Sequence, residues 1–229
     1  MTVEDYKDGQ VILIDKPLNW TSFQVVNKVR WLIRKQFNLK KIKVGHAGTL
    51  DPLATGLLIL CTGKFTKKID TYQAQEKEYT GTFTLGATTP SFDLETEIDK
   101  TFDVSGITSE KIKEATKQFI GEIQQQPPVF SALKKDGKRL YEFARSGEEV
   151  DIPMRTVLVS EFEITNIDLP KVDFKIVCGK GTYIRSLAHD FGKALNNGAH
   201  LSALRRTKIG EFSVEKAIDI ETFEASLLR

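Results

Sequence analysis

One stretch of the sequence surrounds a carboxylate with residues that control the backbone. Residues 45–56 read GHAGTLDPLATG, which places Asp51 among three glycines and directly before Pro52. Glycine permits positive φ angles and close backbone approach, and proline restrains the preceding residue to extended conformations. Such a loop can hold one ionised acid rigidly in the open, where a carboxylate can act as a nucleophile.

Other interpretations of this loop stay open on its residues alone. Asp51 could bond to its own backbone in a tight turn, as aspartates commonly do. The glycines could cradle a phosphate, although the loop lacks the Walker pattern and carries an acid where lysine would be wanted. A hydrolase or phosphotransferase with Asp51 as nucleophile would need a metal set or a general-base histidine, and neither stands at a recognisable position.

The histidines and cysteines do not indicate a metal site or a disulfide framework. Three histidines are scattered without metal-ligand spacing, and the two cysteines lie in apolar, strand-like stretches. We therefore expect no metal ion and a reducing environment. These residues are His46, His189, His200, Cys61 and Cys178.

Length and composition predict one compact catalytic domain over residues 1–229. The chain has 229 residues, 40% of them hydrophobic, which is enough to bury a sizeable core. The formal charge is only +2, so attraction to a nucleic acid would have to come from local clusters of basic residues. The first residues do not resemble a secretory signal, and no apolar run approaches a membrane span, so we expect a cytoplasmic protein without membrane contact.

The elements that must position Asp51 can be predicted from periodicity. Residues 11–15 predict a strand, and Thr21 or Ser22 can cap a helix that runs to about Phe37. Residues 57–61 predict a buried strand directly after the Asp51 loop. The apolar residues of the predicted helix recur at helical spacing, at Phe23, Val26, Val29, Ile33 and Phe37.

Further along the chain, strands outnumber helices. Strands are predicted at residues 77–85, 157–167, 172–178 and 201–208, and helices at residues 109–120 and 182–195. In the first of these strands one face carries Tyr79, Gly81, Phe83 and Leu85. The pattern predicts an α+β fold, mixed, with a largely antiparallel central sheet flanked by helices and loops.

The segment at about residues 124–150 differs from its surroundings. It reads QQQPPVFSALKKDGKRLYEFARSGEEV, with two adjacent prolines, an Asp136-Gly137 turn signal and several basic residues. We interpret it as an insertion that forms a protruding hairpin and helix.

GHAGTLDPLATGLL resembles the motif of the TruB family of pseudouridine synthases, with Asp51 at its invariant aspartate. Four further segments resemble the family in the same order, so that the likeness spans about residues 10 to 215. They are IDKP at 14–17, KEY at 77–79, the thumb hairpin at 128–145, and GKGTYIR at 179–185.

The chain departs from the family pattern at two places. Residues 89–93 read TPSFD, where relatives often read Thr-Asp-Thr-x-Asp, and this puts RNA contacts there in doubt. Many bacterial relatives carry a PUA domain after the catalytic core, whereas here we expect no C-terminal PUA domain.

The resemblance implies the pseudouridine synthase fold and a bacterial stand-alone enzyme. It implies a tRNA pseudouridine synthase that flips and isomerises the T-loop uridine at tRNA position 55, without a cofactor. The expected partner is the tRNA T stem-loop, with no obligate protein partner, and we expect a monomer. The alternative is a non-catalytic RNA-binding module that recognises T-arm-like RNA.

The resemblance also implies catalytic roles for three residues. Asp51 would attack ribose C1′ or uracil C6, or assist elimination to a glycal, and Arg185 would hold its carboxylate ionised. Tyr79 would stack on the uracil and relay a proton. From the residues alone, Arg185 could equally be a surface residue at a helix start, and Tyr79 a core aromatic.

Substrate-binding and RNA-binding roles follow from the same resemblance. His46 would fill the space vacated by the flipped base, and Tyr183 and Leu204 would line the uracil pocket. Lys16 and Pro17 are expected to support the Asp51 loop without touching substrate. The predicted phosphate contacts, which could also be merely solvated, are Lys134, Lys135, Lys138, Arg139, Arg205, Arg206 and Lys208.

Overall fold

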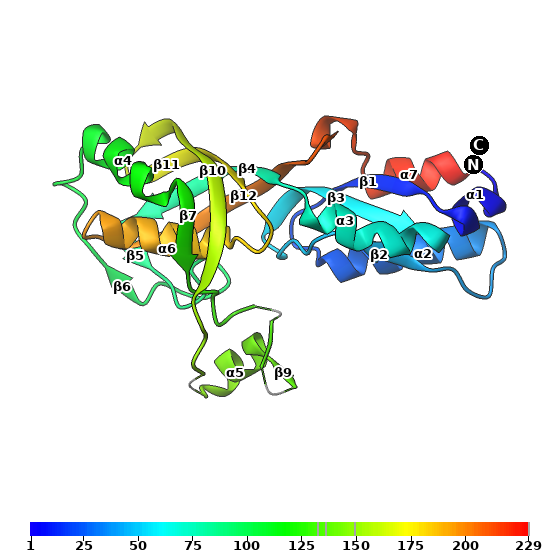
Figure 1. The fold of residues 1–229 in the computed structure, drawn as a ribbon, viewed down its shortest axis with the longest axis horizontal. Coiled ribbons are helices and arrows are strands. Elements are labelled where there is room, and N and C mark those ends of the chain that lie inside the picture. Colours follow the sequence, from blue (N-terminus) through cyan, green and yellow to red (C-terminus); the bar gives the residue numbers. More distant parts are fainter. Residues whose placement is uncertain (132, 136, 149, 229) are drawn as a thin grey trace. The chain divides into compact units, whose positions relative to one another are not determined.

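The computed structural model describes residues 1–131, 133–135, 137–148 and 150–228. The chain divides into two compact units, which we call the terminal unit (Met1–Tyr79 and Leu204–Arg229) and the central unit (Thr80–Ala203). Strands β4 (Lys77–Leu85) and β12 (Ala199–Ile209) each have residues in both units (Figure 1). Each unit is described by itself below.

The sheet of the terminal unit is centred on β3 (Ala54–Thr62). One edge of β3 pairs antiparallel with β1 (Val11–Lys16), and the other pairs with β2 (Val44–His46) and, in parallel, with β12. A short strand, β13 (Phe212–Ser213), pairs with β12. The Asp51 loop is therefore the connection between β2 and β3.

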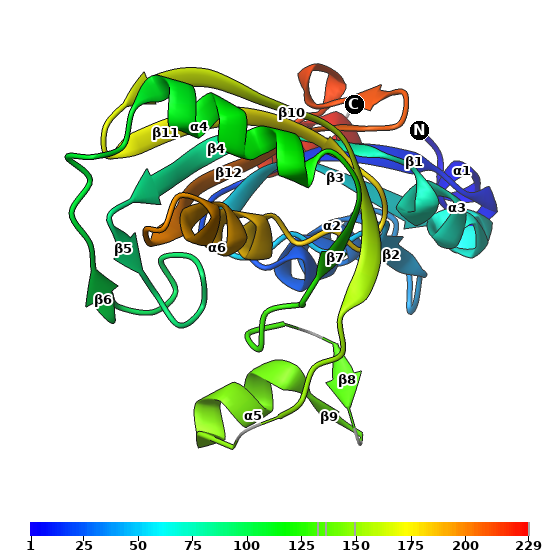
Figure 2. The ribbon, with the colours of Figure 1, turned by 60° about the vertical axis from the view of Figure 1, so that its left-hand side comes forward.

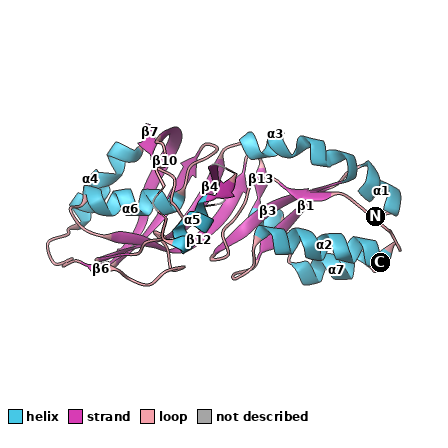
Figure 3. Cartoon of the chain, turned by 90° about the horizontal axis from the view of Figure 1, so that it is seen from below, coloured by secondary structure: helices cyan, strands magenta, loops and turns pink. Residues whose placement is uncertain are grey.

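Helices cover both faces of this sheet, which explains why β3 is apolar along its length. One face packs against α2 (Ser22–Gln36), α7 (Ile220–Leu227) and Tyr6 of α1 (Val3–Asp8). The opposite face packs against the 3₁₀ helix η1 (Gly63–Lys68) and α3 (Ile69–Ala74), as Figure 3 shows. Alternate residues of β3 serve the two faces: Leu58 and Leu60 the first, and Leu57, Ile59 and Cys61 the second.

Helix α2 begins as its sequence predicts. The Thr21 side chain accepts a hydrogen bond from the backbone of Gln24, and the Gln24 side chain bonds back to the backbone of Thr21, which forms a capping box. The predicted apolar stripe is wrong at one position, because Phe23 is 64% exposed. At about 100° per residue, Phe23 is rotated by about 120° from Val29, near the centre of the buried stripe, so it lies beyond the edge of that stripe.

The central unit contains the strand order β4, β11 (Lys171–Cys178), β10 (Arg155–Asp168) and β7 (Gly121–Gln125). Helices α4 (Ser109–Thr116), η2 (Lys117–Phe119) and α6 (Ile184–Ala194) belong to the same unit, as does the small pair β5 (Ala87–Thr88) and β6 (Lys100–Thr101). Rings from three strands, η2 and α6 meet in one aromatic cluster and so join these elements in the core; they are Phe83, Phe119, Phe162, Phe174 and Phe191.

The predicted hairpin and helix lie between β7 and β10. They consist of β8 (Lys134–Lys135), β9 (Lys138–Arg139) and α5 (Leu140–Ser146), drawn away from the sheet in Figure 2. Asp136 of the predicted turn and the side chains of Lys134 and Lys135 lie outside what the structure describes.

The predicted fold class, mixed α+β with a mostly antiparallel sheet, is confirmed. The predicted strands and the helices α2, α4 and α6 are present within a few residues of their expected ends. The short helices α1, α3 and α7 were not predicted. Among the described residues, no helix combines the length and apolar character that a membrane span requires.

Candidate active site

Two of the three glycines around Asp51 have the backbone conformation expected of them. Gly48 and Gly56 have φ angles of +97° and +101°, which favour glycine. Gly56 also allows β12 to approach, since an added Cβ would lie 2.3 Å from the carbonyl oxygen of Arg206. Gly45 lies in β2 and Gly56 in β3, so the loop between the two strands is shorter than predicted.

Lys16 supports this loop through hydrogen bonds to backbone carbonyls, as predicted. Its side chain is fully buried, and its Nζ donates to the carbonyls of Trp20 (2.5 Å), Pro17 (2.9 Å) and Pro52 (3.4 Å). Burial lowers the pKa of Lys16 to about 8, and the nearby Asp51 carboxylate opposes this shift. The loop therefore rests on an ammonium group that attracts Asp51 without facing solvent.

Two further residues hold the loop on either side of Asp51. The hydroxyl of Ser22 donates to the carbonyl of Leu50 (3.0 Å) and accepts from its backbone N–H (2.8 Å). The backbone N–H of Asn19 donates to the carbonyl of Pro52 (2.8 Å). Both chain neighbours of Asp51 are thus attached, Leu50 to the first residue of α2 and Pro52 to the segment before it, so Asp51 is held on a rigid backbone.

Arg206 was predicted to contact phosphate, and the structure contradicts this assignment. The side chain is only 1% exposed, and its guanidinium donates to the carbonyls of Leu57 (2.8 Å) and Gly48 (3.1 Å). Buried arginines are rare and need such partners. Arg206 is a structural clamp between β12 and the Asp51 loop.

His46 falls within the predicted loop of residues 45–56, but the structure places it in a strand. It is the last residue of β2, opposite Leu60 of β3, and it is half-buried. Burial and the charge of Arg206 lower the pKa of His46, so that the ring is neutral at neutral pH. Its proposed role towards a flipped base remains a prediction.

The other predicted residues of the terminal unit differ in exposure. Tyr79 is 9% exposed at the end of the β4 segment in this unit. Leu204 is half-buried opposite Ala54 of β3. Arg205 makes a two-bond ion pair with Asp15 at 2.7 and 3.0 Å, and Lys208 pairs with Glu78 at 3.2 Å. These basic groups are partly neutralised before any RNA binds.

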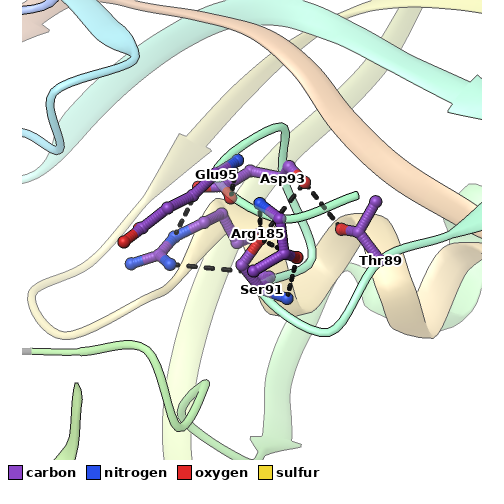
Figure 4. A network of polar contacts seen from close by, with 6 residues as sticks. Thr89, Ser91, Asp93, Glu95 and Arg185 are labelled. Atoms are coloured by element: carbon purple, nitrogen blue, oxygen red, sulfur yellow. Dashed lines mark hydrogen bonds and ion pairs between the residues drawn. The ribbon is translucent and has the colours of Figure 1, made fainter. Parts of the chain in front are cut away.

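In the central unit, the buried Arg185 faces an acid that was not among the predicted site residues. Its Nε lies 3.6 Å from Oδ2 of Asp93, and its Nη1 lies 3.5 Å from the carbonyl oxygen of Ser91 (Figure 4). Arg185 and Asp93 are 4% and 5% exposed, respectively. An ion pair in so dry a setting is screened little by water and fixes the guanidinium plane.

Hydrogen bonds shape the segment that carries Asp93. Thr89 Oγ1 donates to the carbonyl of Asp93 at 2.6 Å, and Glu95 N–H donates to Asp93 Oδ1 at 3.0 Å. The hydroxyls of Ser91 and Thr96 lie 2.8 Å apart and cross-link its two halves. Threonine, serine and aspartate form such local bonds in ordinary loops too, so the sequence alone does not reveal that this loop serves Arg185.

Tyr183 and the thumb residues complete the predicted set. Tyr183 directly precedes α6 and is half-buried, and the guanidinium carbon of Arg155 lies 5.7 Å from its ring centroid. Lys138 and Arg139 are exposed on β9, where they can meet a charged partner. Lys138 Nζ also lies 5.5 Å from the ring centroid of Phe143 on α5.

The predicted site residues fall into both units. Asp51, His46, Tyr79 and Leu204 belong to the terminal unit, whereas Arg185 and Tyr183 belong to the central unit. The pairing of Asp51 with Arg185 therefore stays a prediction. Within the part of the chain that the structure describes, no group of three or more histidine, cysteine or acidic residues is arranged to hold a metal ion.

Two family models match the chain from residue 34 to residue 229. The family model for the N-terminal domain of TruB family pseudouridylate synthases matches residues 34–184. A second model, for the C-terminal domain of tRNA pseudouridylate synthase B, matches residues 185–229.

Similar proteins and solved structures point the same way. The chain is 64% identical to tRNA pseudouridine synthase B of Flavobacterium johnsoniae over 99% of this chain and 100% of that relative. It is 46% identical to the Chlorobaculum tepidum protein of the same name over 97% of this chain and 92% of that relative. A chain in a Cbf5-Nop10-Gar1 complex is similar with a TM-score of 0.71 at 33% identity; the match covers 98% of this chain but only 56% of that one.

Proposed function

The chain belongs to the TruB family of pseudouridylate synthases, and from this premise we propose that it isomerises the T-loop uridine at position 55 of tRNA. The family acts on tRNA, and curated relatives across the full length of the chain are tRNA pseudouridine synthases. The observation that carries the proposal is the Asp51 loop, whose backbone is held on both sides of the acid by Lys16, Asn19 and Ser22.

The reaction needs a carboxylate held in this way. The N1–C1′ bond of uridine breaks, the uracil turns within the site, and a C5–C1′ bond forms while C5 loses its proton and N1 gains one. An ionised acid can attack C1′ or C6 and later depart, or assist elimination to a glycal. Because no atom is added from outside and the reaction involves no net oxidation or reduction, the protein needs no cofactor for this chemistry.

The remaining site residues fit roles around a base that has left the helix. Tyr79 stacks on the uracil and relays a proton, and Tyr183 and Leu204 line its pocket. Arg185, oriented by Asp93, holds the Asp51 carboxylate ionised. His46 fills the space left by the flipped base, and its neutral ring suits a position next to other bases.

The RNA is expected to reach this site as a folded T stem-loop and to be bound by a monomer in the cytoplasm, where tRNA is modified. Lys138 and Arg139 of the thumb are exposed and suited to phosphate contact. The alternative, an RNA-binding module without catalysis, would use the same surface but would not need a clamped carboxylate.

Tritium release tests the proposal directly. Unmodified tRNA carrying [5-³H]uridine is incubated with the native chain and with Asp51→Asn, which keeps the size of the side chain but removes its charge. We expect release by the native chain and a loss of at least about 10³-fold in the variant, as is typical when an essential catalytic group is removed. RNA binding by Asp51→Asn should persist in a filter assay. Equal release by both chains would exclude Asp51, and no release by the native chain would favour the binding module.

A further inference from the structure

A ring stack joins the Asp93 segment to helix α6. The rings of Phe92 and His189 have centroids 4.0 Å apart and planes only 15° from parallel. Phe92 directly precedes Asp93, and His189 lies one helical turn after Arg185 on α6. Because residues four apart share a helix face, α6 offers the same segment a guanidinium and, one turn later, an imidazole.

The bonds described above mostly shape the segment internally and do not attach it. The hydroxyl groups of Thr89, Ser91 and Thr96 and the backbone N–H of Glu95 bond to atoms within residues 89–96. Contacts that attach the segment to the rest of the unit include the Arg185 guanidinium, the N–H of Leu201 donating to the carbonyl of Phe92 (2.8 Å), and the ring stack.

The ring stack is also the apolar part of this attachment. The nearby Leu94 is 53% exposed, so its side chain cannot anchor the segment. The ring of Phe92 is half-buried against α6. Burial, aided by Lys193 and opposed by Asp99, lowers the pKa of His189 to about 4, so the stacked imidazole is uncharged at neutral pH.

The backbone at Phe92 needs such an attachment. Its φ angle is +64°, in the left-handed region that a bulky residue rarely adopts. A conformation of this kind persists where the surrounding structure holds it, and it occurs most often at functional sites. With the backbone turned at Phe92, its ring meets His189 and the following Asp93 carboxylate meets Arg185, both on α6.

We infer that Phe92 and His189 are a positioning pair for uridine isomerisation: their stack docks residues 89–96 on α6 and so sets Asp93 against the Arg185 guanidinium. The inference rests on the proposed function and extends it to residues outside the resemblance, since Phe92 lies within the stretch TPSFD that departs from the family pattern. Neither ring needs to touch the RNA.

Variants at Phe92 separate the ring from the strained backbone. Phe92→Ala removes the ring and keeps the strain; Phe92→Gly removes the ring and accepts the positive φ angle; Phe92→Tyr keeps the ring. Because small misplacements of catalytic groups are costly, we expect kcat to fall about 10- to 100-fold in the first two variants, with KM for tRNA nearly unchanged. Phe92→Tyr should retain native kcat.

Variants at His189 test the other half of the pair. His189→Ala should lower kcat as much as Phe92→Ala, and the double variant should be no worse than either, because both remove one interaction. His189→Phe keeps a stacked ring without a proton and should restore kcat. NMR titration should show the pKa of His189 rising towards 6.5 in Phe92→Ala, as the uncovered ring becomes hydrated.

A control variant excludes loss of stability as the cause. Phe119→Leu trims a different ring of the central unit, 6.2 Å from Phe191, and should lower Tm while leaving kcat native. Native kcat in Phe92→Ala, recovery in Phe92→Gly, or an unmoved His189 pKa would each overturn the inference. A native chain that releases no tritium would instead refute the proposed function.

Discussion

Lys16 is a buried cation whose partners are carbonyl oxygens, with Asp51 close enough to affect its charge. Hydrogen bonds to a charged group contribute about 1.5–3 kcal/mol each, and removing the donor leaves the acceptors unsatisfied. The ammonium therefore both stabilises the chain and fixes the loop that presents the carboxylate.

Replacing this lysine should lower both the stability of the chain and the rate of the reaction. For Lys16→Met we expect a loss of roughly 3 kcal/mol in unfolding free energy and a fall in kcat of about 10-fold or more, because the carbonyl of Pro52 loses its hydrogen bond to the ammonium group. Urea unfolding and single-turnover tritium release measure the two effects. Ile14→Ala, a core truncation in the same strand, should cost a similar 2–5 kcal/mol with native kcat. Parallel losses of kcat in both variants would contradict this role.

His189 makes stability depend on pH. The folded chain keeps it neutral down to about pH 4, whereas the unfolded chain protonates it near its ordinary pKa of 6.5. Between these values the unfolded state binds the extra proton, so its share of the stability is present above pH 6.5 and is lost as pH falls towards 4. Tm measured from pH 7 to pH 4 should therefore drop less in His189→Phe than in the native chain. Identical slopes would show that His189 is not held neutral.

Gly56 sets how closely two parallel strands meet. An alanine Cβ there would lie 2.3 Å from the carbonyl oxygen and 2.8 Å from the nitrogen of Arg206, at a φ angle of +101°. The strands would have to separate, and Arg206 would be pulled from the carbonyls it holds.

We expect Gly56→Ala to destabilise the chain by more than about 2 kcal/mol and to reduce kcat, since the Asp51 loop moves with β3. Gly106→Ala is the matched control, because a Cβ there meets no atom within 4 Å and the φ angle is ordinary. The denaturant midpoints of the two variants measure the difference in stability between them. Equal midpoints would mean that the strands tolerate separation.

The elements themselves differed in how well they could be predicted. The capping box at Thr21 and the unbroken apolar run of β3 are local signals, and both were correctly interpreted. The helices α1 and α3 span only six residues each, too few for periodicity to show, and they depend on packing against the sheet. The prediction that Phe23 is buried was wrong, because helical spacing alone does not show which face of the helix packs against the sheet.

The parts of the candidate site whose backbone conformation follows from residue type could be predicted from the sequence. The contacts of buried side chains could not, because they depend on how the chain packs. The residue types at Gly48, Gly56 and Asp51 alone predict an acid in a segment with a constrained backbone. In the sequence, Arg206 is indistinguishable from an exposed residue of a basic run. Only the packing of the strands shows that it is buried and that its guanidinium bonds to backbone carbonyls of the protein. Asp93 was not predicted as a site residue, because its role depends on the buried guanidinium of Arg185, which is far away in the sequence.

RNA affinity of the whole chain should depend on few basic residues, since the net charge is only +2. Lys138 on the thumb is exposed, so Lys138→Gln should reduce the slope of log affinity against log salt by about one, with little effect on Tm. Lys117→Gln is the matched control, because that exposed lysine already pairs with Glu114 of the preceding turn. Filter binding to tRNA at several salt concentrations measures both slopes. A larger change in the control would remove the thumb from the RNA-binding surface.

The terminal unit is built from both ends of the chain, with the central unit inserted between them. During synthesis the ribosome therefore releases every residue of the central unit before Arg206, the clamp on the Asp51 loop, has emerged. A nascent chain would carry the acid from early on but would lack the strand that immobilises it. The Asp51 loop would therefore be fully immobilised only after β12 has been synthesised and has paired with β3.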